Sequence, residues 1–284
     1  MLTSVRAGHL TVRGISVAGV YTSLHVPELD VLLDCGIALR SCAGAGTLLL
    51  SHGHADHAGA LAALLGIRAL NNQKRPLRVV MPIEIVDDVK LALQAMSALQ
   101  RWPLEIDAIG VAPGDEVALK GDLHVRALKT YHPVPSLAYV FFRRVSKLKP
   151  EHAGMSGADI AARRKAGDRS IFEEVEQVEL AYATDTLVQV LDREPALAAA
   201  RVLMMECTFL DERKSLDAAR AGCHVHLDEL IERAEAITNP HVVLMHLSQI
   251  YRPDEVRGIL DRRLPASLAQ RVIAFTPTTH EWPG

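Results

Sequence analysis

The order of apolar segments along the chain predicts an α/β fold built from layers. Short β-rich runs alternate with amphipathic helical runs over most of the 284 residues. Alternation of this kind is typical of helices that cover the faces of a sheet. Apolar residues make up 49% of the chain and charged residues 23%, as in an ordinary globular protein. We therefore expect one α/β domain over residues 1–284.

The predicted strands are runs of apolar and β-branched residues. They cover residues 31–34, 47–51, 77–81, 123–132, 137–142, 180–184, 201–207, 241–246 and 271–275. The predicted helices, in which apolar residues recur at helical spacing, cover 57–66, 83–100, 157–167, 227–238 and 253–263. The clearest helix is 83–100, because it directly follows Pro82 and repeats its apolar residues at about helical spacing.

Charge and cysteine content exclude several classes of protein. The net charge of -3 gives no overall basic field, so a polyanionic partner would have to bind a local patch. No run approaches the ~18 uncharged apolar residues of a membrane span, and the first ten residues lack the apolar core of a signal peptide. The four cysteines form no CxxC pair. We therefore expect reduced, packed thiols in a cytoplasmic protein without membrane contact.

The most unusual stretch is LLLSHGHADHAGAL at residues 48–61. Three histidines and an aspartate lie between His52 and His57, directly after an apolar strand. Gly53 and Ala55 are small, so the backbone can curl and direct alternate side chains inward. Imidazole nitrogens combined with a carboxylate suit zinc and related metals, whereas calcium and magnesium prefer oxygen ligands. The alternative is a polar surface turn that is rich in histidine by chance.

Three further metal-type ligands follow strands downstream of this motif. His132, Asp185 and His246 each stand where an apolar run gives way to a loop. Strand ends are where α/β folds usually assemble their sites. Together with the motif, they make a set of five histidines and two aspartates, which suits two metal ions that share one carboxylate.

These motifs, in their order and spacing, resemble the ribonuclease Z branch of the metallo-β-lactamase superfamily over about residues 31–255. LLDCG (32–36) resembles the strand before that family's metal loop, and SHGHADH is similar to its HxHxDH signature. Later segments that resemble the family's motifs are YHPVPSLAYVF (131–141), YATDT (182–186), MECTF (205–209), CHVHLDE (223–229) and LMHLSQIY (244–251). The resemblance implies a four-layer αββα sandwich, a dinuclear metal site at the strand ends and a homodimer.

The resemblance also implies a role for each of these residues. One metal would take His52, His54 and His132, the other would take Asp56, His57 and His246, and Asp185 would bridge both. The ions would be two divalent metals, with zinc expected and manganese or iron as alternatives. Such a pair can hold a hydroxide for in-line attack on phosphorus and can neutralise charge on the phosphoryl oxygens. Asp56 is counted among the catalytic residues as well as the ligands.

A general acid is expected at His224, which aligns with the first histidine of the family's H-S-T segment. Glu206 aligns with the glutamate of the family's E-A-T-F segment and would orient and charge that imidazole. His226 stands where the family has threonine, and it is the alternative acid. A positioned acid of this kind is typically worth ~10²–10⁴ in rate.

Residues 143–179 form the least regular part of the sequence and hold eight lysines and arginines, with few acids before Glu173. Two interpretations are open: a solvated, mobile loop, or a lobe that contacts an RNA phosphate backbone. KLKPEHAGMSGADI (147–160) resembles the start of the tRNA-docking arm of bacterial family members. The chain nevertheless lacks the Gly-Pro dipeptides of such arms.

Other departures from the family pattern are Thr184 in place of glycine, Val225 and His226 in place of Ser-Thr, and Leu247 and Ile250 in the last motif. Three functions therefore compete. The first is an endonuclease that processes RNA 3′ ends, with precursor tRNA as substrate. The second is a hydrolase of a lactone, β-lactam, small ester or cyclic nucleotide, and the third is a non-catalytic binding module. The His224–Glu206 pair favours the nuclease, because lactone and β-lactam hydrolases manage without it.

Overall fold

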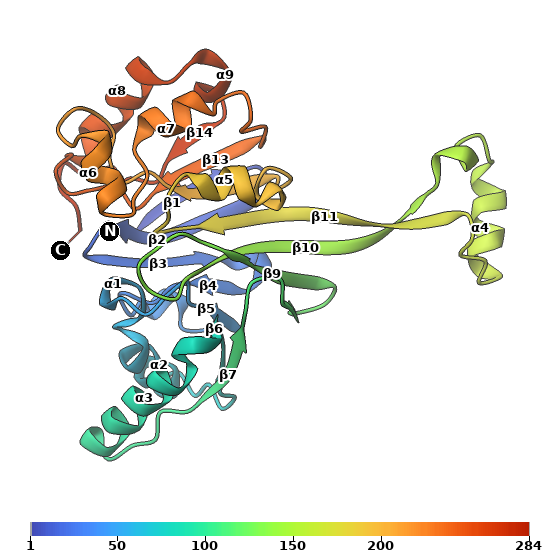
Figure 1. Ribbon diagram of the computed structural model, residues 1–284. Helices are drawn as coiled ribbons and strands as arrows, with labels where there is room; N and C mark the ends of the chain where they lie inside the picture. The colour runs from blue at the N-terminus through green and yellow to red at the C-terminus, as the bar shows by residue number, and fades with distance from the viewer. Residues whose placement is uncertain (1, 284) are drawn as a thin grey trace.

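The computed structural model describes residues 2–283 and contains two stacked seven-stranded sheets with helices on both outer faces (Figure 1). The four-layer αββα sandwich expected from the sequence is confirmed. In the first sheet the strands follow one another in chain order, from β1 to β7. In the second sheet the order is reversed, from β14 to β8. Among residues 2–283, no helix is both long and apolar enough to cross a lipid bilayer.

The two sheets are built in sequence, one from each half of the chain. The first sheet consists of β1 (Thr3–Ala7), β2 (Leu10–Val17), β3 (Tyr21–Val26), β4 (Val31–Leu33), β5 (Thr47–Leu49), β6 (Leu77–Pro82) and β7 (Ile106–Val111). The second consists of β8 (Glu116–Ala118), β9 (Leu123–Lys129), β10 (Leu137–Leu148), β11 (Phe172–Ala183), β12 (Val202–Glu206), β13 (His241–Met245) and β14 (Val272–Ala274). Each sheet is antiparallel at one end and parallel at the other.

The helices belong to the outer layers. Those that follow strands of the first sheet are α1 (Ala55–Ala58), α2 (Leu61–Leu70) and α3 (Val86–Gln100), and α4 (Gly157–Lys165) stands apart from both layers. Those that cover the second sheet are α5 (Gln189–Arg193), α6 (Leu216–Ala221), α7 (Leu227–Glu232), α8 (Pro253–Arg263) and α9 (Ala266–Ala269). Short 3-10 turns lie at Pro27–Leu29, Arg40–Cys42, Ile83–Ile85, Pro150–His152 and Pro195–Leu197.

Three apolar clusters hold the layers together. The central cluster joins the inner faces of the two sheets and includes Leu24, Leu49, Tyr139 and Met204, all fully buried. A second cluster lies between the first sheet and its helices, and a third lies between the second sheet and α5 to α9. The parallel strands therefore contact apolar groups on both faces. This explains why they read in the sequence as continuous apolar runs.

The predicted elements are present, with differences at their ends. Helix α8 matches its predicted bounds, whereas the predicted helix 57–66 is wrong, because the chain ends α1 at Ala58 and starts α2 at Leu61. The predicted helix 227–238 stops at Glu232. The sequence did not predict strands β1, β2, β3, β7 and β8 or helices α5, α6 and α9. These three helices are too short to show helical periodicity, at five, six and four residues.

Residues 143–179 are more regular than the sequence suggests. Strands β10 and β11 pair antiparallel as far as Leu148 and Phe172, and α4 lies at the end of this pair, far from the sandwich (Figure 1). We call residues 143–179 the projecting hairpin. Some of its basic residues are already paired: Arg143 with Asp122, and Arg144 with Glu116 at 2.6 Å. Asp122 and Glu116 precede the segment in the chain, so counting the charges within residues 143–179 does not include them.

Candidate metal centre

The metal-type residues meet at one edge of the sandwich, where strands of both sheets end. The loop after β5 contributes the HxHxDH motif, and the loop after β9 contributes His132. From the second sheet, Asp185 follows β11 and His246 follows β13 directly. Because parallel strands carry their carboxyl ends to the same edge, residues almost 200 positions apart are brought into contact. The His57 and His246 Nε2 atoms, for example, are 3.3 Å apart.

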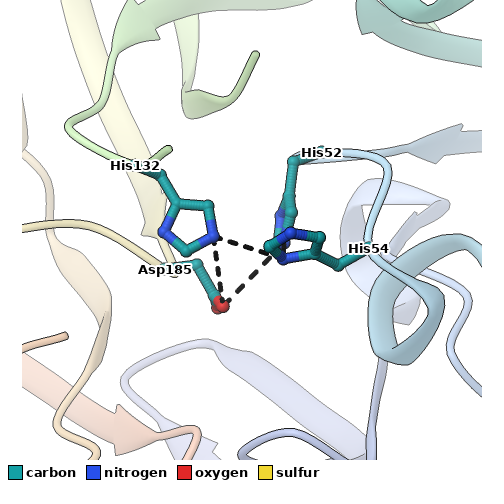
Figure 2. A group of neighbouring side chains, drawn as sticks. All are labelled: His52, His54, His132 and Asp185. Carbon is teal, nitrogen blue, oxygen red and sulfur yellow. Dashed lines mark hydrogen bonds and ion pairs between the residues drawn. The ribbon is translucent and has the colours of Figure 1, made fainter. Parts of the chain in front are cut away.

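Four of these side chains form a first group, shown in Figure 2. The His54 Nδ1 atom lies 3.0 Å from His52 Nε2 and 3.3 Å from His132 Nε2. The Asp185 Oδ2 atom lies 3.8 Å from His52 Nε2 and 4.0 Å from His132 Nε2. Three imidazoles and one carboxylate oxygen thus face a common point.

A second group lies beside the first and shares Asp185 with it. The Asp185 Oδ1 atom is 3.2 Å from Nε2 of both His57 and His246. Asp56 completes the group, with its Oδ2 atom 3.5 Å from His57 Nε2 and 3.9 Å from His246 Nε2. Each oxygen of Asp185 therefore faces a different group.

This donor set fits two divalent metal ions. Nitrogen and oxygen ligands at about 2.0–2.1 Å from one tetrahedral ion are about 3.4 Å from one another, close to the separations within both groups. The histidine tautomers agree, since the outer nitrogens donate to oxygens: His52 to Ser51 Oγ at 2.9 Å, His57 to Asp34 at 2.7 Å, and His246 to Thr208 Oγ1 at 3.1 Å. Their Nε2 lone pairs are left to face the centre.

The electrostatics of the two groups also favour cation binding. Burial, with the neighbouring His57, lowers the pKa of His52 to about 3, so this imidazole is neutral. Burial would raise the pKa of Asp185, but His246 and His57 beside it hold that pKa well below its usual range. Burial would lower the pKa of His57, but Asp185 and Asp34 outweigh it and raise that pKa well above its usual range. Cation binding would therefore release a proton from the His57 imidazole, whereas His52 and Asp185 already have the protonation states that metal ions bind.

The backbone is strained where the site residues leave their strands. Asp34, Asp185 and His246 have positive φ angles of 59°, 44° and 56°. Residues other than glycine rarely adopt this left-handed conformation, and such residues cluster at functional sites. The residue before Asp185 departs from the family pattern, because Thr184 stands where the family has glycine. Thr184 keeps an ordinary φ, and its Oγ1 donates to Asp185 Oδ1 at 2.8 Å, so glycine is not required before the aspartate.

Sequence reasoning missed Asp34, the buried carboxylate that orients His57. Its Oδ2 accepts from His57 Nδ1 at 2.7 Å, from Ser51 Oγ at 2.8 Å and from Tyr182 Oη at 2.6 Å, and its Oδ1 accepts from Ser51 N at 2.6 Å. The only signal was its position, at the end of strand β4 in the LLDCG motif. Its partners lie up to 148 residues away, so their proximity could not be deduced from spacing.

We expect Asp34→Asn to weaken metal affinity by about 10–100-fold, because the carboxylate that fixes the tautomer of His57 loses its charge. The measurement is a competition titration of metal against a chelator. Asp30→Asn is the matched control, since Asp30 flanks the other end of β4, has a similar φ of 58° and bonds to Gly46 N. Equal affinities for both variants would contradict this role of Asp34.

His224 and Glu206 lie together beside the two groups. The His224 Nδ1 atom is 3.2 Å from Glu206 Oε2, and the His224 ring centre is 5.4 Å from that of His246. Glu206 is fully buried and accepts from Thr186 N and Thr208 Oγ1, both at 2.6 Å. Burial alone would lower the pKa of His224, but the Glu206 carboxylate outweighs it and raises that pKa to about 9. The imidazole is thus held as a proton donor.

His226 has a different environment. Its Nδ1 accepts from Asp228 N at 3.1 Å, which makes it the N-cap of α7, and its Nε2 lies 3.1 Å from the carbonyl oxygen of Asp211. Glu229 completes a capping box by accepting from the backbone N–H of His226. Both ring nitrogens of His226 therefore have partners within the fold. A threonine at this position would supply the same N-cap, which explains why histidine can replace the family's threonine here.

One family model and two plant proteins match most of this chain. Residues 30–247 match the family model of the β-lactamase superfamily domain. The chain is 32% identical to tRNase Z TRZ1 of Arabidopsis thaliana, over 93% of this chain and 94% of that protein. It is 33% identical to the chloroplastic tRNase Z TRZ2 of the same plant, over 93% of this chain and 75% of that protein.

Solved structures share the fold at lower identity. The metallo-β-lactamase fold protein YhfI from Bacillus subtilis has a TM-score of 0.61 at 17% identity, over 92% of this chain and 93% of that one. The short form of human tRNase Z has a TM-score of 0.56 at 14% identity, over 94% of this chain and 95% of that one.

Proposed function

The chain belongs to the ribonuclease Z family within the β-lactamase superfamily, and on that premise we propose that it is a metal-dependent endoribonuclease that processes the 3′ ends of precursor tRNA. The observation that carries the proposal is the His224–Glu206 pair beside the metal-type groups, where a ring nitrogen of His224 lies within 4.8 Å of ligand atoms of Asp185 and His246. Hydrolysis of an RNA phosphodiester expels an alkoxide, and such a leaving group needs a proton donor at this position.

We propose that His52, His54 and His132 hold one ion, that Asp56, His57 and His246 hold the other, and that Asp185 bridges them. Two bound divalent ions would supply a water that is acidic enough to attack at neutral pH and would neutralise charge on the phosphoryl oxygens. The chain's own residues do the remaining work. His224 donates the proton that the leaving oxygen needs, and Glu206 keeps that imidazole charged and aligned.

Zinc is the metal that we propose, because five imidazoles and two carboxylates match its usual ligands. The four cysteines are free thiols, which favours a reducing compartment such as the cytoplasm. A homodimer is supported by exposed apolar side chains on and beside α2 and α3, namely Leu70, Leu91, Leu99 and Trp102. Elemental analysis and light scattering test the metal and the dimer.

One assay separates the nuclease from the small-molecule hydrolase. The purified protein is offered a precursor tRNA, bis(p-nitrophenyl) phosphate, a lactone and a β-lactam under the same conditions. The proposal expects cleavage of both phosphodiesters, with a large preference for RNA in kcat/KM. Turnover of the lactone or the β-lactam without RNA cleavage would favour the alternative hydrolase.

We also propose that the projecting hairpin contacts the RNA. Its helix α4 ends in Arg163, Arg164 and Lys165, and these three side chains are exposed. Arg163 forms an exposed, weak ion pair with Asp168 at 3.1 Å, and the Arg164 guanidinium lies 4.9 Å from the centre of the Phe172 ring. The overall charge of -3 gives no general attraction for RNA, so such a cluster is where phosphates would bind.

Replacing Arg163, Arg164 and Lys165 with alanine should weaken RNA binding and change its salt dependence. Each lost contact with single-stranded RNA removes about 0.7 from the slope of log affinity against log salt, so the slope should flatten by about two units. Filter binding at several salt concentrations measures both quantities. Alanine at Lys90, Arg201 and Arg257, which lie outside the hairpin, provides the charge-matched control. An unchanged slope in the hairpin variant would mean that the hairpin does not touch RNA.

A further inference from the structure

A groove adjoins the metal centre, and nothing in the proposed chemistry uses it. It has a volume of about 550 Å³ and lies between the helices α1 and α2 on one side and α3, as far as Met96, on the other. Gly53 and His54 from the metal loop form one wall, and Val134 and Pro135, two and three residues after His132, form another. The groove is therefore built on the same two loops that present metal-type histidines.

The lining of the groove suits an apolar, planar group. Leu61, Ile85, Val89, Ala92 and Met96 are among the apolar side chains that line it. The only ionisable lining side chains among residues 2–283 are His54 and the carboxylate of Asp88. With no lysine or arginine there, the groove would repel a phosphate, whereas a nucleobase offers an apolar face and amino groups that can donate to a carboxylate. Its volume is within the range of sites that hold a small organic ligand.

The position of the groove indicates which of the two nucleobases beside the scissile phosphate it would hold. It shares His54 with the metal centre, whereas His224 is not among the described residues that line it. If His224 protonates the leaving oxygen, the nucleotide that departs lies on the His224 side. The nucleotide on the groove side is then the one that keeps the phosphate after water has attacked phosphorus and the P–O bond to the leaving oxygen has broken.

We propose that this groove binds the base of the nucleotide that retains the scissile phosphate, and so helps to position the strand over the metal centre. The inference rests on the proposed nuclease function and adds a subsite to it. Occupancy of the groove would fix the strand on one side of the phosphorus while the metal-type residues face the phosphate itself. Fixing a substrate in this way raises the fraction of bound strands that are aligned for attack.

The first test uses the wild-type protein and modified RNA. The base on each side of the cleavage site is removed in turn to give two abasic substrates. Loss of the base on the phosphate-retaining side should lower kcat/KM by about tenfold, the effect of losing about 1.4 kcal/mol of apolar contact. Loss of the base on the other side should have a clearly smaller effect. Equal losses, or a larger loss on the leaving side, would overturn the assignment.

The second test fills the groove. Ala92→Phe places a ring inside it, and Ala98→Phe is the matched control on an exposed part of the same helix. Each rate on RNA is divided by the metal content of the same variant from elemental analysis, which corrects for changes at the metals. Ala92→Phe should lose about tenfold on intact RNA but nothing further on the RNA that lacks the phosphate-retaining base. Ala98→Phe should match the wild type.

The remaining outcomes separate this inference from the function on which it rests. RNA left uncut by the wild type would refute the proposed function itself. RNA cut by all variants at the same relative rate, with or without the base, would refute the groove subsite alone. If Ala92→Phe instead changes the molar mass in light scattering, the groove is covered by a second copy of the chain, and the subsite is again refuted.

Discussion

Asp185→Ala should lower phosphodiester hydrolysis by about 10³-fold or more, on RNA and on bis(p-nitrophenyl) phosphate alike. Within residues 2–283, Asp185 is the one carboxylate whose two oxygens face different metal-type groups, with Oδ1 at 3.2 Å from His57 and His246 and Oδ2 at 3.8 Å from His52. On the proposed assignment, each of two ions would lose a ligand in this variant, together with the negative charge of the shared carboxylate. Rate losses of this size follow when a main source of charge stabilisation is removed from an active site.

Metal content should change together with activity. Elemental analysis of the wild type should give about two transition metals per chain, and the variant should retain clearly fewer. Chelation should lower the melting temperature of the wild type, because metal binding contributes to folding free energy. The variant, which holds less metal, should respond less. A variant that keeps both ions and full activity would contradict the bridging role.

A surface acid provides the control for this experiment. Asp192 is exposed and pairs with Arg233 at 2.9 Å, far along the chain from the metal loop. Asp192→Ala removes the same chemical group but should leave the metal content unchanged, since exposed ion pairs contribute only about 0–1 kcal/mol to stability. A similar loss of activity in both variants would point to general destabilisation rather than to loss of a ligand.

The clustering of the metal-type residues could be predicted from the sequence because each follows an apolar strand. His132, Asp185 and His246 follow buried runs, and parallel strands bring such ends to one edge whatever the loops between them contain. The alternation of runs predicted a layered α/β fold, and the family resemblance added the four-layer sandwich. The break between α1 and α2 could not, because Gly59 and Ala60 carry no stronger signal than other small residues in a helical stretch.

Roles that depend on contact partners were beyond the reach of the sequence. Asp34 matters because Tyr182 and His57 reach it, and those contacts exist only once the two sheets are stacked. The register of the general acid was open between His224 and His226. The two residues differ in what their rings contact: the His224 ring contacts Glu206, and the His226 ring contacts the first turn of α7. Sequence spacing cannot separate two histidines that are two residues apart.

His224→Ala should slow RNA cleavage by ~10²-fold or more while hardly affecting an aryl phosphodiester. RNA expels an alkoxide that needs a proton, and His224, held by Glu206 at 3.2 Å, is placed to give it. The phenolate of bis(p-nitrophenyl) phosphate leaves without a proton. The ratio of the two rates therefore reports the acid role itself, and a purely structural effect would lower both rates together. Glu206→Gln keeps the shape of the pair but removes the charge, so it should show the same selective loss to a smaller degree.

His226→Ala completes the argument as the matched control. It removes the N-cap of α7 and should lower the free energy of unfolding by about 1 kcal/mol, as loss of a cap typically does, while the ratio of RNA to aryl turnover stays near that of the wild type. Equal losses on both substrates in His224→Ala would mean that His224 acts as a ligand or a structural residue. A selective loss confined to His226→Ala would move the acid by two positions, and the pair with Glu206 would then need another explanation.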